Sequence, residues 1–255
     1  MTEEKTILQW TYEPKNFFEA PVDYSDSKYK LILQDGNVDA ELSDFQDPVP
    51  DTLLKEVETK VNFFLKARMI LKHETFKVGG VKIRQQRPDG TVRTLAQMKG
   101  KARIFKIKGS QVDIIIENAD GHIVTDTRAE RIAEHQEFMK LIVASAGKHK
   151  LLDELINSYK TAVCDPPNEL VHLYEIQDAL KKHYGKKEKA LKSLGFEKSK
   201  WARLGLISND LPLKEGRHRG KHFGELRYAT EDELDEAREI ARELIQAFAK
   251  KIVLN

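Results

Sequence analysis

The sequence predicts an α+β protein, with an N-terminal domain that mixes strands and one long helix and a C-terminal all-α helical bundle. Two observations predict this class. Short runs rich in β-branched and aromatic residues, separated by Asp-Gly turns, fill the first half of the chain. From Thr127 almost to the end, apolar residues recur instead at spacings of three and four, the period of an amphipathic helix. We therefore expect two domains, residues 1–127 and residues 128–255, although the helix expected at 128–147 could belong to either of them.

The first strands are predicted at residues 6–12, 29–34 and 38–42, where β-branched and aromatic residues are frequent. The last two runs flank the pair Asp35-Gly36. An Asp-Gly pair between two such runs is a strong local signal for a β-hairpin, because both residues tolerate a positive φ. We expect these segments to form the start of one sheet.

A long helix should begin near Asp51, because its apolar residues share one face. That face is formed by Leu54, Val57, Val61, Phe64, Leu65 and Leu71. Arg68 falls in the same stripe, where it could be a buried partner for a carboxylate, but we expect it to mark the edge of the buried face. The face is too apolar for a free surface, so the helix should pack on the sheet.

A second hairpin should follow the long helix. Its strands are predicted at residues 76–86 and 92–95, with a break or bulge at Gly79-Gly80. Further strands are expected at residues 102–108, 112–117 and 122–124.

Helices are expected at residues 128–147 and 151–163, before Pro166 and Pro167 break the pattern. A third helix passes through Leu170 and Leu180, and Gly185 ends it. Two short helices should occupy residues 186–193 and 199–209. The last helix has the clearest start, since Thr230 and Glu233 have the spacing of a capping box.

The composition excludes several classes of protein. The chain of 255 residues is 40% hydrophobic and 33% charged, as in soluble globular proteins. Its one cysteine, Cys164, excludes a disulfide framework and a thiolate metal cluster. No signal peptide or membrane-length apolar run is visible, so we expect a cytoplasmic protein without a membrane partner. No Walker loop, dinucleotide fingerprint or nucleophile elbow occurs, and we expect no cofactor and no metal.

Positive charge is concentrated in one segment. Residues 181–222 hold 13 lysines and arginines against 4 acidic residues, whereas the remainder of the chain is mildly acidic. A local basic patch is the usual electrostatic mark of a polyanionic partner, and a solvated lysine-rich helical face is the alternative. The sequence therefore favours a nucleic acid as one candidate partner.

The basic segment ends in the richest stretch of the chain, Gly216-Arg217-His218-Arg219-Gly220-Lys221-His222, which we call the basic loop. These residue types suit the cleavage of RNA by its own 2′-hydroxyl group. A histidine can move the proton near neutral pH. An arginine can hold the phosphorane oxygens with two parallel hydrogen bonds.

Arg217, four intervening residues and His222 form a pattern that resembles the motif of the HEPN family of ribonuclease domains. The resemblance covers at most residues 128–255. It implies a metal-independent endoribonuclease that works as a homodimer in toxin or antiviral defence systems. It assigns Arg217 to phosphate stabilisation and His222 to acid–base catalysis, with His218 as the polar residue after the arginine. The N-terminal domain would then be a sensor or would bind a protein partner.

A second interpretation is a non-enzymatic nucleic-acid-binding module or assembly subunit. Residues 186–209 resemble a helix-turn-helix, whose second helix enters the DNA major groove. Lys198, Lys200 and Arg203 would lie on that recognition helix, and Trp201 is more readily a core anchor. Basic side chains of the loop, Arg217, Arg219 and Lys221, would contact phosphates.

A third interpretation is structural. Arg217 and Arg219 would pair with carboxylates such as Glu169, Glu175 or Glu225, holding the bundle or a dimer together. The loop histidines would then be satisfied by backbone groups. The interpretations differ in whether the loop cations are neutralised by protein carboxylates.

Overall fold

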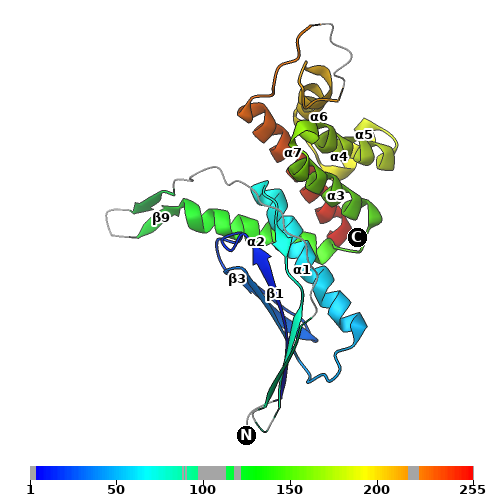
Figure 1. The fold of residues 1–255 in the computed structure, drawn as a ribbon. Helices are drawn as coiled ribbons and strands as arrows, with labels where there is room; N and C mark the ends of the chain where they lie inside the picture. The colour runs from blue at the N-terminus through cyan, green and yellow to red at the C-terminus, as the bar shows by residue number, and fades with distance from the viewer. Residues whose placement is uncertain are drawn as a thin grey trace. The chain divides into compact units, whose positions relative to one another are not determined.

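The structure, a computed structural model, describes residues 4–87, 89, 91–96, 113–117, 122–217 and 224–254. It confirms the α+β class: an antiparallel sheet in the N-terminal part precedes a helical C-terminal part (Figure 1). The chain divides into two compact units. The first comprises Met1–Arg68 and Phe76–Glu137, and the second, the helical unit, comprises Met69–Thr75 and Phe138–Asn255. The predicted boundary at 127/128 coincides with the start of helix α2 (Thr127–Ser145), and the units divide further along that helix.

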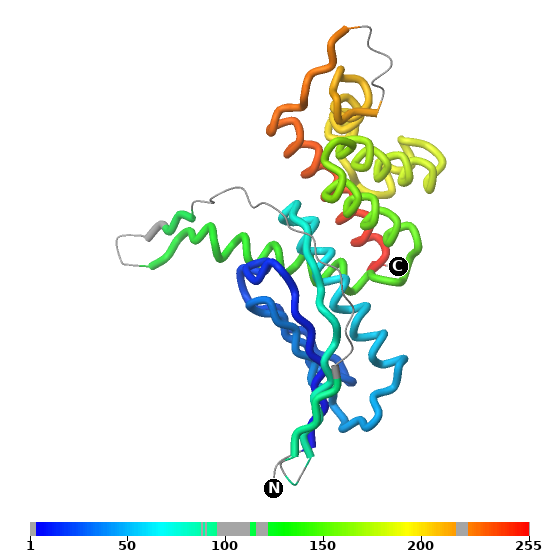
Figure 2. Tube along the Cα trace, in the orientation of Figure 1, coloured from blue at the N-terminus to red at the C-terminus, as the bar shows by residue number. Residues whose placement is uncertain are grey.

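The sheet of the first unit is antiparallel throughout its described pairings. Its strands follow the order β2-β3-β4-β1-β6-β7, and β5 also pairs with β1. Their bounds are β1 Lys5–Glu13, β2 Val22–Ser25, β3 Tyr29–Gln34, β4 Asn37–Leu42, β5 Lys77–Val78, β6 Lys82–Gln86 and β7 Val92–Ala96. The predicted strands at 6–12, 29–34, 38–42 and 92–95 are confirmed, and so is the break before residue 82. β2 was not predicted. Figure 2 shows the hairpin of β6 and β7 running beside β1.

One face of the sheet forms the core, because alternate residues of its strands are buried. In β1 these are Leu8, Trp10 and Tyr12. Helix α1 (Asp51–Lys72) packs on this face, where the ring of Phe64 lies 5.9 Å from that of Tyr24 in β2. The predicted hairpin turn is also present. Asp35 and Gly36 take φ values of 50° and 81°, as expected for an Asp-Gly turn.

The expectation for Arg68 is wrong, because this side chain is 2% exposed and lies inside the buried face of α1. Hydrogen bonds compensate its burial. Its Nε donates to the carbonyl oxygen of Phe17 at 2.7 Å, and one terminal nitrogen lies 2.7 Å from Nδ1 of His135. The carboxylate of Glu19 lies 3.6 Å from the other terminal nitrogen. A buried arginine with these contacts joins the segment before β2 to α1 and α2.

A separate two-stranded sheet consists of β8 (Ile115–Glu117) and β9 (Ile123–Asp126). It agrees with the strands predicted at 112–117 and 122–124. The strand predicted at 102–108 lies outside the described residues.

The helical unit is built from α3 (Lys150–Cys164), α4 (Glu169–Tyr184), α5 (Lys187–Leu194), α6 (Lys198–Gly205) and α7 (Glu231–Leu254). α3, α4 and α7 pack on one another, and α5 and α6 pack against α4 and α7 (Figure 1). A 3₁₀ turn at Pro166–Asn168 occupies the predicted break, and Gly185 ends α4 as expected. The core is apolar and includes Leu155, Ile156, Leu173, Ile176, Leu244, Ile245 and Phe248. Among the described residues, no helix combines the length and apolarity needed to cross a membrane.

Candidate nucleic-acid interface

The segment that precedes the basic loop contains an unusual turn. α6 does not end at Gly205 but widens into a π-helical turn, Leu206–Asp210, of a kind that often marks functional sites. Residues 211–217, which we call the first arm, follow this turn. Residues 224–230 form the second arm.

Backbone hydrogen bonds tie the two arms together. The N–H of Lys214 donates to the carbonyl of Arg227 at 2.9 Å, and the N–H of Arg227 donates to the carbonyl of Pro212 at 3.1 Å. A carboxylate oxygen of Glu215 accepts the N–H of Ala229 at 3.1 Å. The backbone of the two arms is therefore held together by these hydrogen bonds.

The second arm is also fixed to the start of α7 by the predicted capping box. The hydroxyl of Thr230 accepts the N–H of Glu233 at 3.2 Å, and the Glu233 carboxylate accepts the N–H of Thr230 at 2.9 Å. Arg227 adds two hydrogen bonds to the same carboxylate, at 2.6 and 2.7 Å. The hydrogen bonds from Arg227 lower the pKa of Glu233 to about 2. This carboxylate is therefore ionised at neutral pH and holds the arm in place.

Arg217 ends the described part of the first arm, and its backbone is anchored while its side chain is exposed. Its N–H donates to the carbonyl of Ser208 in the π-helical turn at 2.8 Å. Its guanidinium group lies over the ring of Tyr174 on α4, 5.1 Å from the ring centroid. Such a cation–π contact orients the guanidinium without neutralising its charge.

Carboxylates neutralise the other arginines that the structure describes in the helical unit. These pairs are Arg203–Glu236, Arg227–Glu233, Arg238–Glu169 and Arg242–Glu239. Arg217 is the exception, since no carboxylate among the described residues lies within ion-pair distance of it. The structural interpretation had named Glu169, Glu175 and Glu225 as carboxylates that could pair with Arg217 and Arg219. Glu169 instead pairs with Arg238, and Glu175 lies 3.5 Å from Nδ1 of His172.

The other predicted loop residues, His218, Arg219, Lys221 and His222, lie outside the described residues. The three cations assigned to the recognition helix are described. Lys198 is exposed at the start of α6. Lys200 and Arg203 are paired across to α7, with Nζ to Glu243 at 2.6 and 2.8 Å and the guanidinium to Glu236 at 2.8 and 2.9 Å. These hydrogen bonds raise the pKa of both cations.

Trp201 anchors α6 in the core, as the sequence suggested. Its side chain is 4% exposed, and its backbone carbonyl accepts a hydrogen bond of 2.6 Å from the buried amide of Gln177 on α4. α5, the turn at Gly195 and α6 thus have the order of a helix-turn-helix. The side of α6 that carries Lys200 and Arg203 is turned toward α7.

A buried charge cluster lies elsewhere in the helical unit. Arg238 makes two hydrogen bonds to Glu169, at 2.6 and 2.9 Å, and Nε2 of His73 lies 3.3 Å from the same carboxylate. Burial alone would raise the pKa of Glu169, but hydrogen bonds from His73 and Arg238 outweigh it and lower the pKa. The ring of Tyr159 packs edge-on against His73 at 5.8 Å. These groups therefore contact mainly one another.

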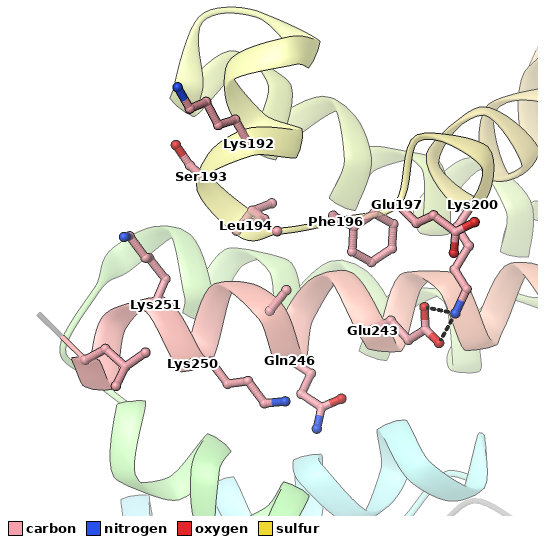
Figure 3. Close-up of a pocket in the computed structure, with 13 residues that line it drawn as sticks. Lys192, Ser193, Leu194, Phe196, Glu197, Lys200, Glu243, Gln246, Lys250 and Lys251 are labelled. Carbon is pink, nitrogen blue, oxygen red and sulfur yellow. Dashed lines mark hydrogen bonds and ion pairs between the residues drawn. The ribbon is translucent and has the colours of Figure 1, made fainter.

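A groove of about 730 Å³ runs between the turn joining α5 to α6 and the C-terminal half of α7 (Figure 3). Lys192, Lys250 and Lys251 lie on it, together with the ring of Phe196. The pair of Lys200 and Glu243 closes one end (Figure 3). Because that ion pair is satisfied internally, the lysines near the two helix ends are the cations that this groove offers to solvent.

Sequence reasoning missed the two residues that position Arg217. Tyr174 lies on α4, far from the loop in sequence, and that helix was predicted from the spacing of its apolar residues alone. Ser208 contributes its backbone carbonyl, and the amino-acid sequence does not reveal where a carbonyl points. The sequence signal for such a residue is a tyrosine at the exposed edge of an apolar helix face. It points to a cation–π contact only once the fold is known to bring an arginine to it.

No family model matches this chain, and the searches found no similar protein among curated sequences or solved structures.

Proposed function

We propose that the helical unit binds RNA at the basic loop and cleaves it as a metal-independent endoribonuclease. The observation that carries this proposal is the state of Arg217. It is the described arginine of the helical unit without a carboxylate partner, and it rests on Tyr174 with its guanidinium exposed. An arginine held in place but not neutralised suits a phosphate ligand.

The chemistry divides between Arg217 and His222. The 2′-hydroxyl oxygen attacks the adjacent phosphorus, and the bond from phosphorus to the 5′-oxygen breaks. Neutral His222 takes the 2′-hydroxyl proton, and a protonated histidine, His222 of a second copy or His218, gives a proton to the leaving oxygen. Arg217 stabilises the negative charge that develops on the phosphorane oxygens.

The remaining parts of the proposal follow the family resemblance. Arg219 and Lys221 hold the flanking phosphates. A homodimer brings two basic loops to one RNA strand, and the N-terminal unit senses a trigger or binds a protein partner. This arrangement belongs in a toxin or antiviral defence system of the cytoplasm.

The rival function is binding through the helix-turn-helix at residues 186–209. The order of α5, turn and α6 supports it. Two of the three cations on its recognition helix, Lys200 and Arg203, form ion pairs with carboxylates of α7. These ion pairs would have to break before either side chain could bind a phosphate. The loop is therefore the better supported contact, with Lys198 as a peripheral one.

An RNA-cleavage assay in EDTA tests the proposal. The full chain is compared with Arg217→Ala and His222→Ala, and Arg242→Ala serves as control because its guanidinium is paired with Glu239 on the same helix. We expect each loop substitution to lower the rate by about 10²- to 10⁴-fold and the control to leave it unchanged. Equal cleavage by all variants would overturn the catalytic assignment.

Binding of the same RNA in the absence of cleavage would favour the rival. Lys198→Ala, Lys200→Ala and Arg203→Ala should then weaken binding together with Arg217→Ala, whereas under the loop proposal Lys200→Ala and Arg203→Ala should leave binding unchanged. Light scattering of the full chain tests the proposed homodimer. A monomeric mass at all concentrations would contradict it.

A further inference from the structure

Tyr228 on the second arm exposes its aromatic ring to solvent. Its side chain is 69% exposed, and it is the one Phe, Tyr or Trp among the described residues that is mostly open to solvent. An aromatic ring left in water forgoes the burial that normally stabilises it. The rings of Tyr174 and Tyr184, in the same unit, are partly covered.

The exposed ring is held at a fixed point. Its neighbour Arg227 is tied to the first arm by backbone hydrogen bonds on both its N–H and its carbonyl. The next residue, Ala229, donates its N–H to Glu215. Tyr228 therefore projects from an anchored backbone rather than from a loose end, and little ordering is needed before it binds.

A cation accompanies the ring. Nζ of Lys214 on the first arm lies 4.0 Å from the centroid of Tyr228. Lys214 is itself exposed, and no carboxylate among the described residues pairs with it. The first arm repeats this combination at Arg217 and Tyr174. The first arm thus supplies the cation of two cation–aromatic pairs, Lys214 with Tyr228 and Arg217 with Tyr174.

An aromatic ring beside a cation that has no carboxylate partner is suited to binding single-stranded RNA. An unstacked base stacks on the ring, and the cation meets the adjoining phosphate. A base inside a duplex cannot reach such a ring, because both of its faces are already stacked. Exposed cation–π pairs alone add little stability, so packing does not account for the arrangement.

We propose that Tyr228 is a stacking site for an unpaired base and that Lys214 contacts the neighbouring phosphate, which makes single-stranded RNA the substrate of the basic loop. This inference rests on the proposed function and extends it to a subsite outside the Arg217 to His222 motif. Tyr228 and Lys214 position the strand and take no part in the proton transfers.

The test is equilibrium binding of a fluorescein-labelled single-stranded RNA of mixed sequence to the full chain, measured by fluorescence anisotropy in EDTA. His222→Ala is present throughout, so that the probe stays intact. Tyr228→Ala should weaken binding by about 5- to 100-fold, since one base stack is lost. Tyr228→Phe should bind normally, and Tyr228→Leu, which keeps an apolar side chain without a ring, should be weakened as well.

Lys214→Ala should weaken binding, whereas Lys60→Ala should not. Lys60 is the matched control, because it lies over the ring of Tyr24 at 4.7 Å in the other unit. The same sequence as a duplex should bind weakly to the parent and be insensitive to Tyr228→Ala.

The outcomes separate this inference from the proposed function. If Arg217→Ala weakens the single strand but Tyr228→Ala and Tyr228→Leu do not, the stacking site is wrong and the proposed loop contact stands. Equal losses on single-stranded and duplex RNA would also overturn the stacking site. If neither Arg217→Ala nor Tyr228→Ala weakens RNA binding, the stacking site and the proposed loop contact are both wrong.

Discussion

The guanidinium group of Arg217 lies over the ring of Tyr174, with 5.1 Å between its central carbon and the ring centroid. Because the ring orients the arginine without cancelling its charge, Tyr174 should act through Arg217. We expect Tyr174→Leu to slow RNA cleavage by about 2- to 5-fold, the value of an exposed cation–π contact, and Tyr174→Phe to retain the rate. Initial rates at saturating RNA measure this, with thermal melting as a check of the fold. A Tyr174→Phe variant as slow as Tyr174→Leu would contradict the role of the ring.

The salt dependence of RNA binding should be steep if the basic loop contacts phosphates. Each phosphate contact to a single strand adds about 0.7 to the slope of log affinity against log salt. Arg219→Ala and Lys221→Ala should each weaken binding and reduce that slope by about this amount. Lys182→Ala is the control, because Lys182 pairs with Asp178 one turn away on α4. A slope near zero for the parent protein would exclude a phosphate-dominated interface.

The pair of Glu169 and Arg238 should contribute strongly to the stability of the helical unit. Arg238→Ala leaves the carboxylate of Glu169, which is 3% exposed, without its main partner. Breaking such a pair typically costs about 3 kcal/mol, whereas Arg242→Ala removes only a surface pair and should cost less than about 1 kcal/mol. Urea unfolding followed by circular dichroism compares them. The double variant Glu169→Leu with Arg238→Met should be less destabilised than Arg238→Ala, and the opposite order would show that packing dominates.

The stability of the helical unit should fall in acid through Glu233. Its pKa of about 2 in the folded protein lies below the ordinary value of 4.5, so folding favours its ionised form. The resulting stabilisation is complete above about pH 4.5 and is lost as the pH falls toward 2. Glu233→Gln should lower the stability at pH 7 and flatten its change over this interval. Urea midpoints at several pH values measure this, and parallel curves for the two proteins would refute the assignment.

The turn at Gly36 should not tolerate a side chain. Its φ of 81° is unfavourable for alanine, and an added Cβ would lie 2.7 Å from Lys15 and 3.1 Å from the carbonyl of Tyr12. We expect Gly36→Ala to destabilise the first unit by at least about 1 kcal/mol. Gly205→Ala is the comparison, because Gly205 is helical and its added Cβ meets only ordinary contacts, so this change should be neutral or stabilising. Thermal unfolding distinguishes them, and equal effects would argue against strain at Gly36.

The elements that sequence predicts well are those whose signals are local. The Asp35-Gly36 turn, the Gly185 helix end and the Thr230 to Glu233 capping box depend on neighbouring residues, and all three are present. β2 was missed because its four residues, Val22–Ser25, are too few to show a period. Arg68 was misjudged because its burial depends on Phe17, Glu19 and His135, which only the fold brings to it.

The candidate site follows the same rule. The sequence gives the basic loop as a concentration of charge. It does not indicate which cations remain available, because that depends on distant carboxylates. From the sequence, Lys200 and Arg203 were expected to contact a nucleic acid, but in the fold they pair with Glu243 and Glu236 of α7. Tyr174 gained significance only when α4 brought it under Arg217.

His73 belongs to the helical unit although it stands in the sequence between two parts of the first unit. Its ring meets Glu169 and Tyr159. A fragment that begins at residue 128 would keep the buried carboxylate and lose the histidine beside it. The two units are interleaved along the gene, so recombination at a single point cannot transplant the helical unit intact. Any exchange of one unit for another during evolution would have to carry the segment Met69–Thr75 as well.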